Sequence, residues 1–396
     1  MEAVSVNVDF SERVKRLPPY LFAEMEKVIL RKKAEGVNII TLSIGDPDLP
    51  PPPEVLSTLS EEAANPKNHN YSFSQGEPFF KKAVAEWYKV RFGVDLDPES
   101  EVIALIGSKE GLANVSRAFI NPNDHVLVPD PSYPVYMNGA TILSEGVPKV
   151  LPLLEENDFK PVLDAEVLEK DTKLMFLNYP NNPTGSVVDK AFLRSVVDFA
   201  SDNNLILCYD NAYSEITFDG YRAPSILEVD GAKEVALEFH SCSKTFNMTG
   251  DRIGFAVGNR RLLEGLVRVK SQIDSGPPVY IQKAAAKALG TYKSSEPPRH
   301  VAAVNQIYKE RRDALVKGLR SLGFRCQAPK ATFYVWLNCG CSSAEFALRL
   351  LDLGVVVTPG SGFGRYGENY VRFSLTRPKD EIEAACERMT ELRLKF

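Results

Sequence analysis

Short apolar runs alternate with amphipathic stretches through the middle of the chain. The runs at 102–106, 125–128, 173–177, 205–209, 237–240 and 253–257 have the length of buried strands. Between most of them, apolar residues recur with helical spacing, as at 78–91, 110–119 and 191–201. This alternation predicts an α/β sandwich built around a largely parallel sheet.

The pattern changes after about residue 290. A long amphipathic helix is predicted at 301–322, followed by apolar runs at 333–337, 355–357 and 370–375 with helices among and after them. Near the N-terminus, 11–35 reads as a helix that is entered through Leu17-Pro18-Pro19 and then runs from Tyr20 to a stop at Gly36, before a strand at 38–44. We expect a large domain at 51–289 and a smaller, discontinuous α+β domain at 1–50 and 290–396.

Composition narrows the class of protein. The 396 residues are 44% apolar and 25% charged, with a net charge of −5, which gives no general attraction to nucleic acid or to anionic membranes. No apolar run has the length of a membrane span, and the N-terminus lacks the pattern of a secretory signal. The six cysteines and four histidines lack metal-ligand spacing. We therefore expect a cytoplasmic protein with reduced thiols and no metal site, nucleic-acid partner or membrane partner.

Several polar segments directly follow predicted strands. Gly107-Ser108-Lys109 follows the run at 102–106, Asp210 follows 205–209, and the segment 241–244 follows 237–240. Ligands of open α/β sheets bind beyond the carboxyl ends of the strands. We expect these segments to meet at one edge of the sheet.

Lys244 is the first candidate for chemistry. Its amine can condense with an aldehyde, while the hydroxyls of Ser241 and Ser243 and the guanidinium of Arg252 suit a phosphate dianion. Pyridoxal phosphate carries both an aldehyde and a phosphate. A surface lysine in a serine-rich turn is the structural alternative for this stretch taken alone.

Other residues match the needs of the same cofactor. A carboxylate such as Asp210 keeps the ring nitrogen protonated, and Asn182 and Tyr213 can donate to the phenolic oxygen. Ser108 opens a helix that suits phosphate, and Tyr133 can stack on the ring. Each residue alone also fits a cap, a turn or core packing. Their joint occurrence favours a pyridoxal phosphate site.

On these motifs the chain resembles the fold-type I, pyridoxal phosphate-dependent aminotransferases of the class I/II group, over nearly its whole length. The matching segments are Gly45-Asp46-Pro47, Tyr71, Gly107-Ser108-Lys109, Pro131-Ser132-Tyr133-Pro134, Asn182-Pro183-Thr184-Gly185, Asp210-Asn211-Ala212-Tyr213, Ser241-Cys242-Ser243-Lys244, Arg252-Ile253-Gly254 and Val371-Arg372-Phe373. The resemblance implies the fold-type I transferase fold, a ping-pong transfer of an amino group to a 2-oxo acid, and a homodimer with shared active sites.

The resemblance also assigns roles. It makes Lys244, Asp210 and Tyr213 catalytic, with Lys244 bonding the cofactor aldehyde and moving the substrate proton. Cofactor contacts are implied for Tyr71 (from the neighbouring subunit), Ser108, Lys109, Tyr133, Asn182, Asp210, Tyr213, Ser241, Ser243, Lys244 and Arg252. Substrate contacts are implied for Tyr20, Gly45, Lys109, Tyr133, Asn182, Ser275 (across the dimer interface) and Arg372, which clamps the α-carboxylate.

Within that group, the segments 17–22, 213–225, 238–250 and 253–259 are similar to LL-diaminopimelate aminotransferases. That similarity implies exchange between LL-diaminopimelate and 2-oxoglutarate, a reaction of lysine biosynthesis. Plant-type members have an acidic residue where this chain has Ser74, and many relatives have a bulky residue at Asp251. Aspartate, alanine and aromatic aminotransferases therefore stay open as alternatives.

Three other classes of protein are alternatives to an aminotransferase. A pyridoxal phosphate-dependent C–S lyase would keep the same cofactor residues. A non-catalytic binding protein need not retain Lys244, Asp210 and Arg372 together. A nicotinamide site is suggested by Gly360-Ser361-Gly362-Phe363-Gly364, but the following residues predict a turn where that site needs a helix.

Overall fold

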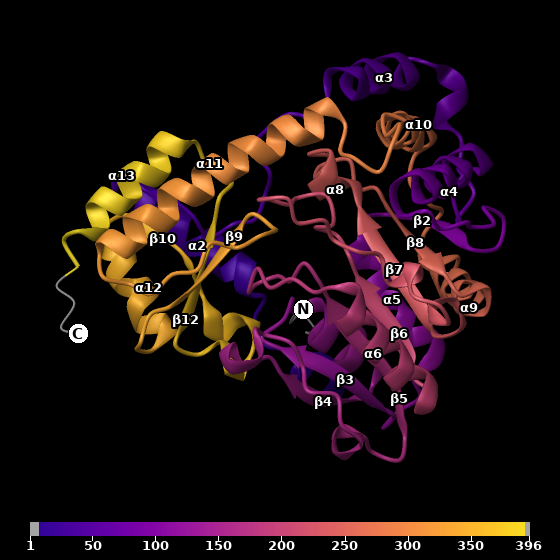
Figure 1. Ribbon diagram of the computed structural model, residues 1–396, viewed down its shortest axis with the longest axis horizontal. Helices are drawn as coiled ribbons and strands as arrows, with labels where there is room; N and C mark the ends of the chain where they lie inside the picture. Colours follow the sequence, from indigo (N-terminus) through magenta and orange to yellow (C-terminus); the bar gives the residue numbers. More distant parts are fainter. Residues whose placement is uncertain (1–7, 393–396) are drawn as a thin grey trace, which may run out of the picture.

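The computed structural model describes residues 8–392, which form two lobes (Figure 1). The larger lobe contains a seven-stranded sheet whose strand order is β2-β8-β7-β6-β5-β3-β4. In chain order the strands are β2 (Val102–Leu105), β3 (His125–Asp130), β4 (Val147–Pro152), β5 (Thr172–Asn178), β6 (Ile206–Asp210), β7 (Ala236–Ser241) and β8 (Gly254–Gly258).

Strand directions explain why polar segments gather at one edge. Neighbouring strands from β4 to β7 are parallel, so their carboxyl ends lie together. Strand β8 runs antiparallel to both β7 and β2, with Gly254 opposite Ser241 and Leu105. The beginning of β8 therefore lies at the edge where β2 and β7 end, and Arg252 comes just before it.

Helices bury both faces of this sheet. One face packs into a core that includes Val84, Leu193 and Ala284, and the other into a core that includes Leu112 and Leu263. The helices of the lobe are α3 (Pro53–Ala63), α4 (Pro78–Phe92), α5 (Ser108–Phe119), α6 (Lys190–Asp202), α7 (Ala232–Val235), α8 (Cys242–Thr245), α9 (Arg260–Lys270) and α10 (Val279–Leu289). The mostly parallel sheet between helices confirms the predicted α/β class.

The smaller lobe is built on the antiparallel sheet β11-β12-β9 and the parallel pair β1-β10. The long helix α11 runs from the large lobe across this lobe (Figure 1). The elements of the small lobe are β1 (Ile40–Thr41), α11 (Arg299–Ser321), β9 (Tyr334–Asn338), α12 (Ser343–Asp352), β10 (Val355–Val356), β11 (Thr358–Pro359), β12 (Tyr370–Ser374) and α13 (Lys379–Met389).

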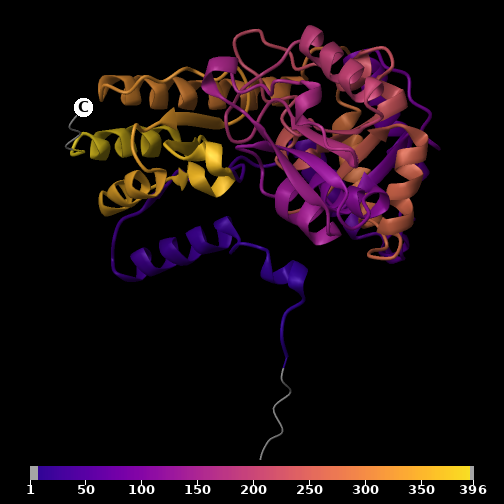
Figure 2. The ribbon, with the colours of Figure 1, turned by 90° about the horizontal axis from the view of Figure 1, so that it is seen from below.

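The N-terminal segment contains the helix predicted from Tyr20 to Gly36, as α2, and a short helix before it that was not predicted. Two helices form, α1 (Glu12–Lys15) and α2 (Leu21–Ala34), because the pair Pro18-Pro19 between them cannot supply main-chain donors for a continuous helix. Helix α2 packs through Ile29 against Leu351 and Val356, while α1 reaches toward the large lobe (Figure 2). The domain boundaries at residues 50 and 290 stay a prediction.

Two strands were not predicted from the sequence, β4 of the large sheet and the two-residue strand β11 of the small lobe. Strand β4 carries Pro148 and Pro152, which lower its resemblance to a strand, and most of its residues are half-buried. It forms the end of the sheet beside β3, where proline is tolerated. Within residues 8–392, no helix is both long enough and apolar enough to cross a membrane.

Candidate active site

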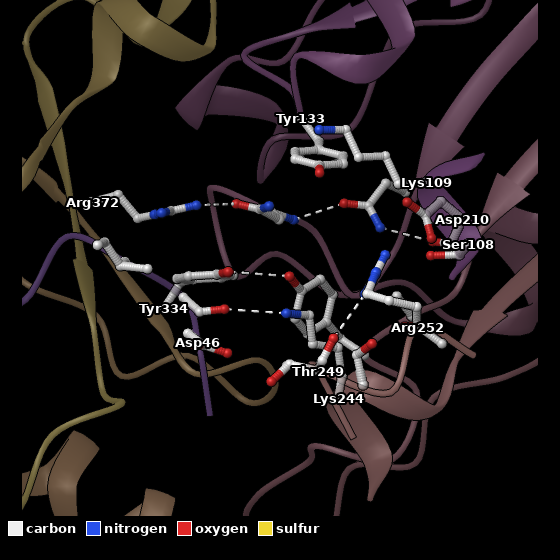
Figure 3. A pocket seen from close by; sticks show the side chains of 18 of the residues that line it. Asp46, Ser108, Lys109, Tyr133, Asp210, Lys244, Thr249, Arg252, Tyr334 and Arg372 are labelled. Carbon is white, nitrogen blue, oxygen red and sulfur yellow. Dashed lines mark hydrogen bonds between the residues drawn. The ribbon is translucent and has the colours of Figure 1, made fainter. Parts of the chain in front are cut away.

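A pocket of about 250 Å³ lies at the carboxyl edge of the large sheet, where it faces the small lobe (Figure 3). Side chains from both lobes line it. The lining residues are Tyr20, Ile44, Gly45, Asp46, Ser108, Lys109, Tyr133, Asn178, Asn182, Asp210, Ala212, Tyr213, Ser241, Ser243, Lys244, Thr249, Arg252, Tyr334 and Arg372. Thirteen of the fifteen residues predicted from the sequence are therefore brought together.

Asp210 ends β6 and presents a buried carboxylate to the pocket. Its Oδ2 accepts a hydrogen bond of 2.7 Å from the Tyr136 hydroxyl. Its Oδ1 makes no hydrogen bond of ordinary geometry within the described part of the chain. Burial raises the pKa of Asp210 to about 6, and the hydrogen bond from Tyr136 opposes that rise. At neutral pH about nine in ten Asp210 side chains are ionised.

Lys244 lies in the short helix α8, directly after β7. Its Nζ donates a 3.1 Å hydrogen bond to the main-chain oxygen of Gly45. Burial lowers the pKa of Lys244 to about 8, with the cations Arg252 and Arg372 acting in the same direction and Asp46 opposing them. At neutral pH about one amine in ten is then unprotonated, so this lysine is prepared for nucleophilic and base chemistry.

Groups that suit a phosphate surround the N-terminus of α5. Ser108 begins that helix, and Arg252 reaches over Gly107, where a Cβ atom would lie 2.3 Å from its Nη2. Gly107 has φ +73°, so both its conformation and its lack of a side chain are required. The hydroxyl of Ser243 is buried without a hydrogen-bond partner among residues 8–392, and Ser241 lies beside the same pocket. Together, these hydroxyls, the guanidinium and the N-terminus of α5 can bind an anion.

Arg372 lies on β12, at the opposite side of the pocket, and is 1% exposed. Its two terminal nitrogens donate to Asn182 Oδ1 at 2.7 Å and to the main-chain oxygen of Ser43 at 2.8 Å. Burial lowers the pKa of Arg372, and a guanidinium in a protein keeps its charge. The side chain is therefore a fixed positive charge, held where a carboxylate can approach.

Tyr334 is a pocket residue that sequence analysis missed. Its hydroxyl lies 3.1 Å from that of Tyr213, and the guanidinium of Arg372 lies 4.1 Å from its ring centroid. A Cβ atom on Gly45 would lie only 1.9 Å from the Tyr334 hydroxyl, which explains glycine at that position. Tyr334 is a buried residue of β9 beside the buried residue Val335, so the sequence pattern does not distinguish it from a core residue.

The predicted residues Tyr20, Lys109 and Tyr133 lie together at one side of the pocket. Lys109 Nζ donates a 3.0 Å hydrogen bond to the hydroxyl of Tyr20 and lies 4.6 Å from its ring centroid. The ring of Tyr133 lies 5.9 Å from the same nitrogen. Because Tyr20 is 46% exposed, this group forms the entrance of the pocket.

Two predicted residues lie outside the pocket of their own chain. Tyr71 is 92% exposed, and Ser275 is exposed in the segment after α9. The two segments touch, since the Ser72 hydroxyl donates to the main-chain oxygen of Pro277 at 2.7 Å and lies 3.1 Å from that of Ser275. Their expected contacts with a neighbouring subunit stay a prediction.

Sequence comparisons agree with this site. Residues 37–389 match the family described as aminotransferase class I and II. The chain is 50% identical over 384 residues to an LL-diaminopimelate aminotransferase from Desulforudis audaxviator, covering 96% of each chain. It is 48% identical over 391 residues to one from Aquifex aeolicus, covering 98% of this chain and 100% of that one.

Solved structures share the fold. Substrate-bound BacF from Bacillus subtilis superposes with a TM-score of 0.91 at 37% identity, covering 98% of each chain. An aspartate aminotransferase mutant from Thermus thermophilus superposes with a TM-score of 0.89 at 29% identity, covering 96% of this chain and 99% of that one. With the family match, these likenesses confirm the predicted fold and enzyme class. The chain belongs to the class I and II aminotransferases.

Proposed function

We propose that this aminotransferase uses pyridoxal phosphate to exchange the amino group of LL-diaminopimelate with 2-oxoglutarate, as a step of lysine biosynthesis. Identity of 45–50% over almost the whole chain to LL-diaminopimelate aminotransferases supports the substrate. The observation that carries the chemistry is one pocket that holds both Lys244, with its lowered pKa, and the half-paired carboxylate of Asp210.

The pocket fits pyridoxal phosphate. Ser108, Ser241, Ser243 and Arg252 would hold the phosphate, with Tyr71 added from the neighbouring subunit, and the unpaired hydroxyl of Ser243 supports this assignment. Asp210 would hold the ring nitrogen through its free Oδ1, with Tyr133 against the ring and Asn182 and Tyr213 donating to the phenolic oxygen. When bound, the cofactor supplies an aldehyde that accepts the amino group and a ring that stabilises negative charge at the substrate carbon.

Lys244 performs the proton transfer. With the cofactor bound, Lys244 would hold its aldehyde, and the free Nζ would serve as the base that takes the proton from the donor's α-carbon and later returns it. A general base is most effective when its pKa lies near the pH of the reaction, and the pKa of Lys244, about 8, lies close to neutral pH. Gly45 holds this nitrogen through its main-chain oxygen when the amine is free.

Arg372 orients both substrates in turn. Each substrate has an α-carboxylate, and a planar guanidinium pairs with a carboxylate through two parallel hydrogen bonds. The donor leaves as a 2-oxo acid before the acceptor enters, so one clamp serves both halves of a ping-pong reaction. Gly45 leaves room for the substrate beside Tyr334, and Tyr20 and Lys109 close the entrance.

A homodimer completes the site in this proposal. Tyr71 and Ser275 are exposed on neighbouring segments and contribute nothing to the pocket of their own chain. Exposed apolar side chains of Phe73 and Ile273 accompany them. Such a surface suits contact with a second copy of the chain, which would carry both residues to the partner's pocket.

Substrate choice is tested with purified enzyme, 2-oxoglutarate as acceptor, and LL-diaminopimelate, aspartate, alanine or phenylalanine as donor. We expect kcat/KM for LL-diaminopimelate to exceed that of every other donor by at least about a hundredfold, because a site built for polar groups rejects donors that lack them. A preference for aspartate, alanine or phenylalanine would assign the enzyme to one of those classes. Release of a thiol from cysteine conjugates would indicate a C–S lyase.

Replacing Arg372 by alanine is expected to raise KM about a hundredfold for every amino donor, because a buried charge pair with the common α-carboxylate is lost. Arg372→Lys keeps the charge without the planar fork and should recover part of the loss. Steady-state kinetics with two unlike donors provide the measurement. A defect confined to one donor would assign Arg372 to side-chain recognition.

A further inference from the structure

The two oxygens of Asp210 have different surroundings. Oδ2 receives the Tyr136 hydroxyl at 2.7 Å, and Oδ1, which has no such bond within the described chain, is left for the pocket. Asn178 fixes the main chain at the same point, since its side-chain amide donates to the main-chain oxygen of Asp210 at 2.7 Å. The side-chain hydrogen bond that holds the carboxylate is therefore made to Oδ2.

Tyr136 is itself held rigidly. It is fully buried in the wide helical turn η2 (Val135–Thr141), and its ring stacks on Phe176 of β5 with centroids 5.1 Å apart and planes inclined by 17°. The ring of Tyr133 meets it edge-on at 6.1 Å, and the Thr141 hydroxyl donates to its main-chain oxygen. The hydroxyl thus has little freedom to leave Asp210.

Tyr136 always acts as a donor in this pair. Burial raises the pKa of Tyr136 far above its ordinary value, so the phenol keeps its proton at every physiological pH. Other groups also act electrostatically on Asp210. They are His240, which is bonded to Glu238, together with Lys244, Tyr133, Tyr209, Tyr213 and the main-chain N–H of Ala212.

We infer that Tyr136 is a positioning residue for this aminotransferase: its hydroxyl holds Asp210 so that Oδ1 faces the ring nitrogen of the cofactor as an anion. The inference rests on the proposed function. It adds a residue that does not line the pocket and acts only through Asp210.

The test compares two ligands of the cofactor-free protein, pyridoxal phosphate and an analogue whose ring nitrogen is replaced by carbon. Dissociation constants are measured through quenching of tryptophan fluorescence. The wild-type protein is expected to bind pyridoxal phosphate about a hundredfold more tightly than the analogue, because only the former pairs with Asp210. In Tyr136→Phe this ratio should fall about tenfold or more, the effect of losing a hydrogen bond to a buried charge.

Tyr209→Phe is the matched control. Tyr209 is also fully buried, adjoins Asp210 in β6, and donates its hydroxyl at 2.8 Å to a main-chain oxygen, that of Tyr179. In this variant the ratio of the two dissociation constants, analogue to pyridoxal phosphate, should stay within about threefold of the wild-type ratio. Tyr136→Leu provides a second side chain without a donor, in case Tyr136→Phe does not fold, and should show the same reduced ratio.

The outcomes distinguish a failure of the role of Tyr136 from a failure of the proposed pairing between Asp210 and the ring nitrogen. A wild-type preference that survives unchanged in Tyr136→Phe or Tyr136→Leu overturns the role of Tyr136 and leaves the proposed function intact. Equal weakening of both ligands, with the ratio unchanged, also overturns it, because that result reveals only a structural defect. A wild-type protein that binds both ligands equally contradicts the pairing of Asp210 with the ring nitrogen, and the role of Tyr136 with it.

Discussion

Replacing Lys244 by alanine is expected to reduce kcat by at least roughly four orders of magnitude with every amino donor. A positioned general base alone contributes about 10²–10⁴-fold, and this lysine also holds the aldehyde. Release of a 2-oxo acid from LL-diaminopimelate or glutamate provides the measurement. Lys82→Ala is the control, because Lys82 is exposed on α4 and, within residues 8–392, its ion pair is with Glu86 at 3.9 Å.

Loss of folding would not explain that result. The pKa of Lys244 is about 8 when folded against an ordinary 10.5, so between these values the unfolded chain binds more protons and stability rises with pH. Below about pH 8 the buried ammonium destabilises the fold in full. Lys244→Ala without cofactor should therefore be at least as stable as wild type at neutral pH. Near-normal turnover in this variant would remove Lys244 from its role.

The second large effect is expected for Asp210→Asn. A neutral amide cannot stabilise a protonated ring nitrogen, and removing one member of a buried charge pair costs about 3–5 kcal/mol, which corresponds to roughly 10²–10⁴-fold in kcat. Measurement of kcat with the best donor tests this. The carboxamide has nearly the shape of the carboxylate, so the change reports the charge. Unchanged turnover would reduce Asp210 to a structural residue.

The same variant should gain stability in the absence of cofactor. Asp210 has a pKa of about 6 when folded against an ordinary 3.8, so the folded state binds more protons between those values and loses stability as the pH rises through them. Above about pH 6 the penalty is present in full, and removing the charge should stabilise the cofactor-free protein by up to about 3 kcal/mol. Denaturant unfolding at neutral pH measures this difference.

The part of the site on strand ends could be predicted from the sequence. Asp210 and Ser241 end buried apolar runs, and the rule that parallel strands end together brings such residues to one edge. Arg252 needed a further step, since it joins them only because β8 is antiparallel to β7. Its assignment came from its place eight residues after Lys244 and from the affinity of a guanidinium for phosphate.

The residues that were missed depend on packing between distant elements. Tyr334 reaches the pocket because its strand, β9, pairs with β12, which carries Arg372. Tyr136 meets Asp210 only after η2 packs on the sheet, 74 residues away in sequence. An aromatic residue beside apolar neighbours reads as core in both cases. Local pattern predicts which segments form strands and helices, but not which hydroxyls turn inward to a polar group.

The central claim is that Lys244 carries the cofactor as a covalent adduct. Reduction of the purified enzyme with borohydride, which makes a lysine–aldehyde bond permanent, followed by proteolysis and mass spectrometry of the peptides, tests it directly. We predict the mass of one reduced pyridoxal phosphate on the peptide that contains Lys244, and none on the peptide that contains Lys109. A label on Lys109 or another lysine, with Lys244 unmodified in active enzyme, would contradict the account.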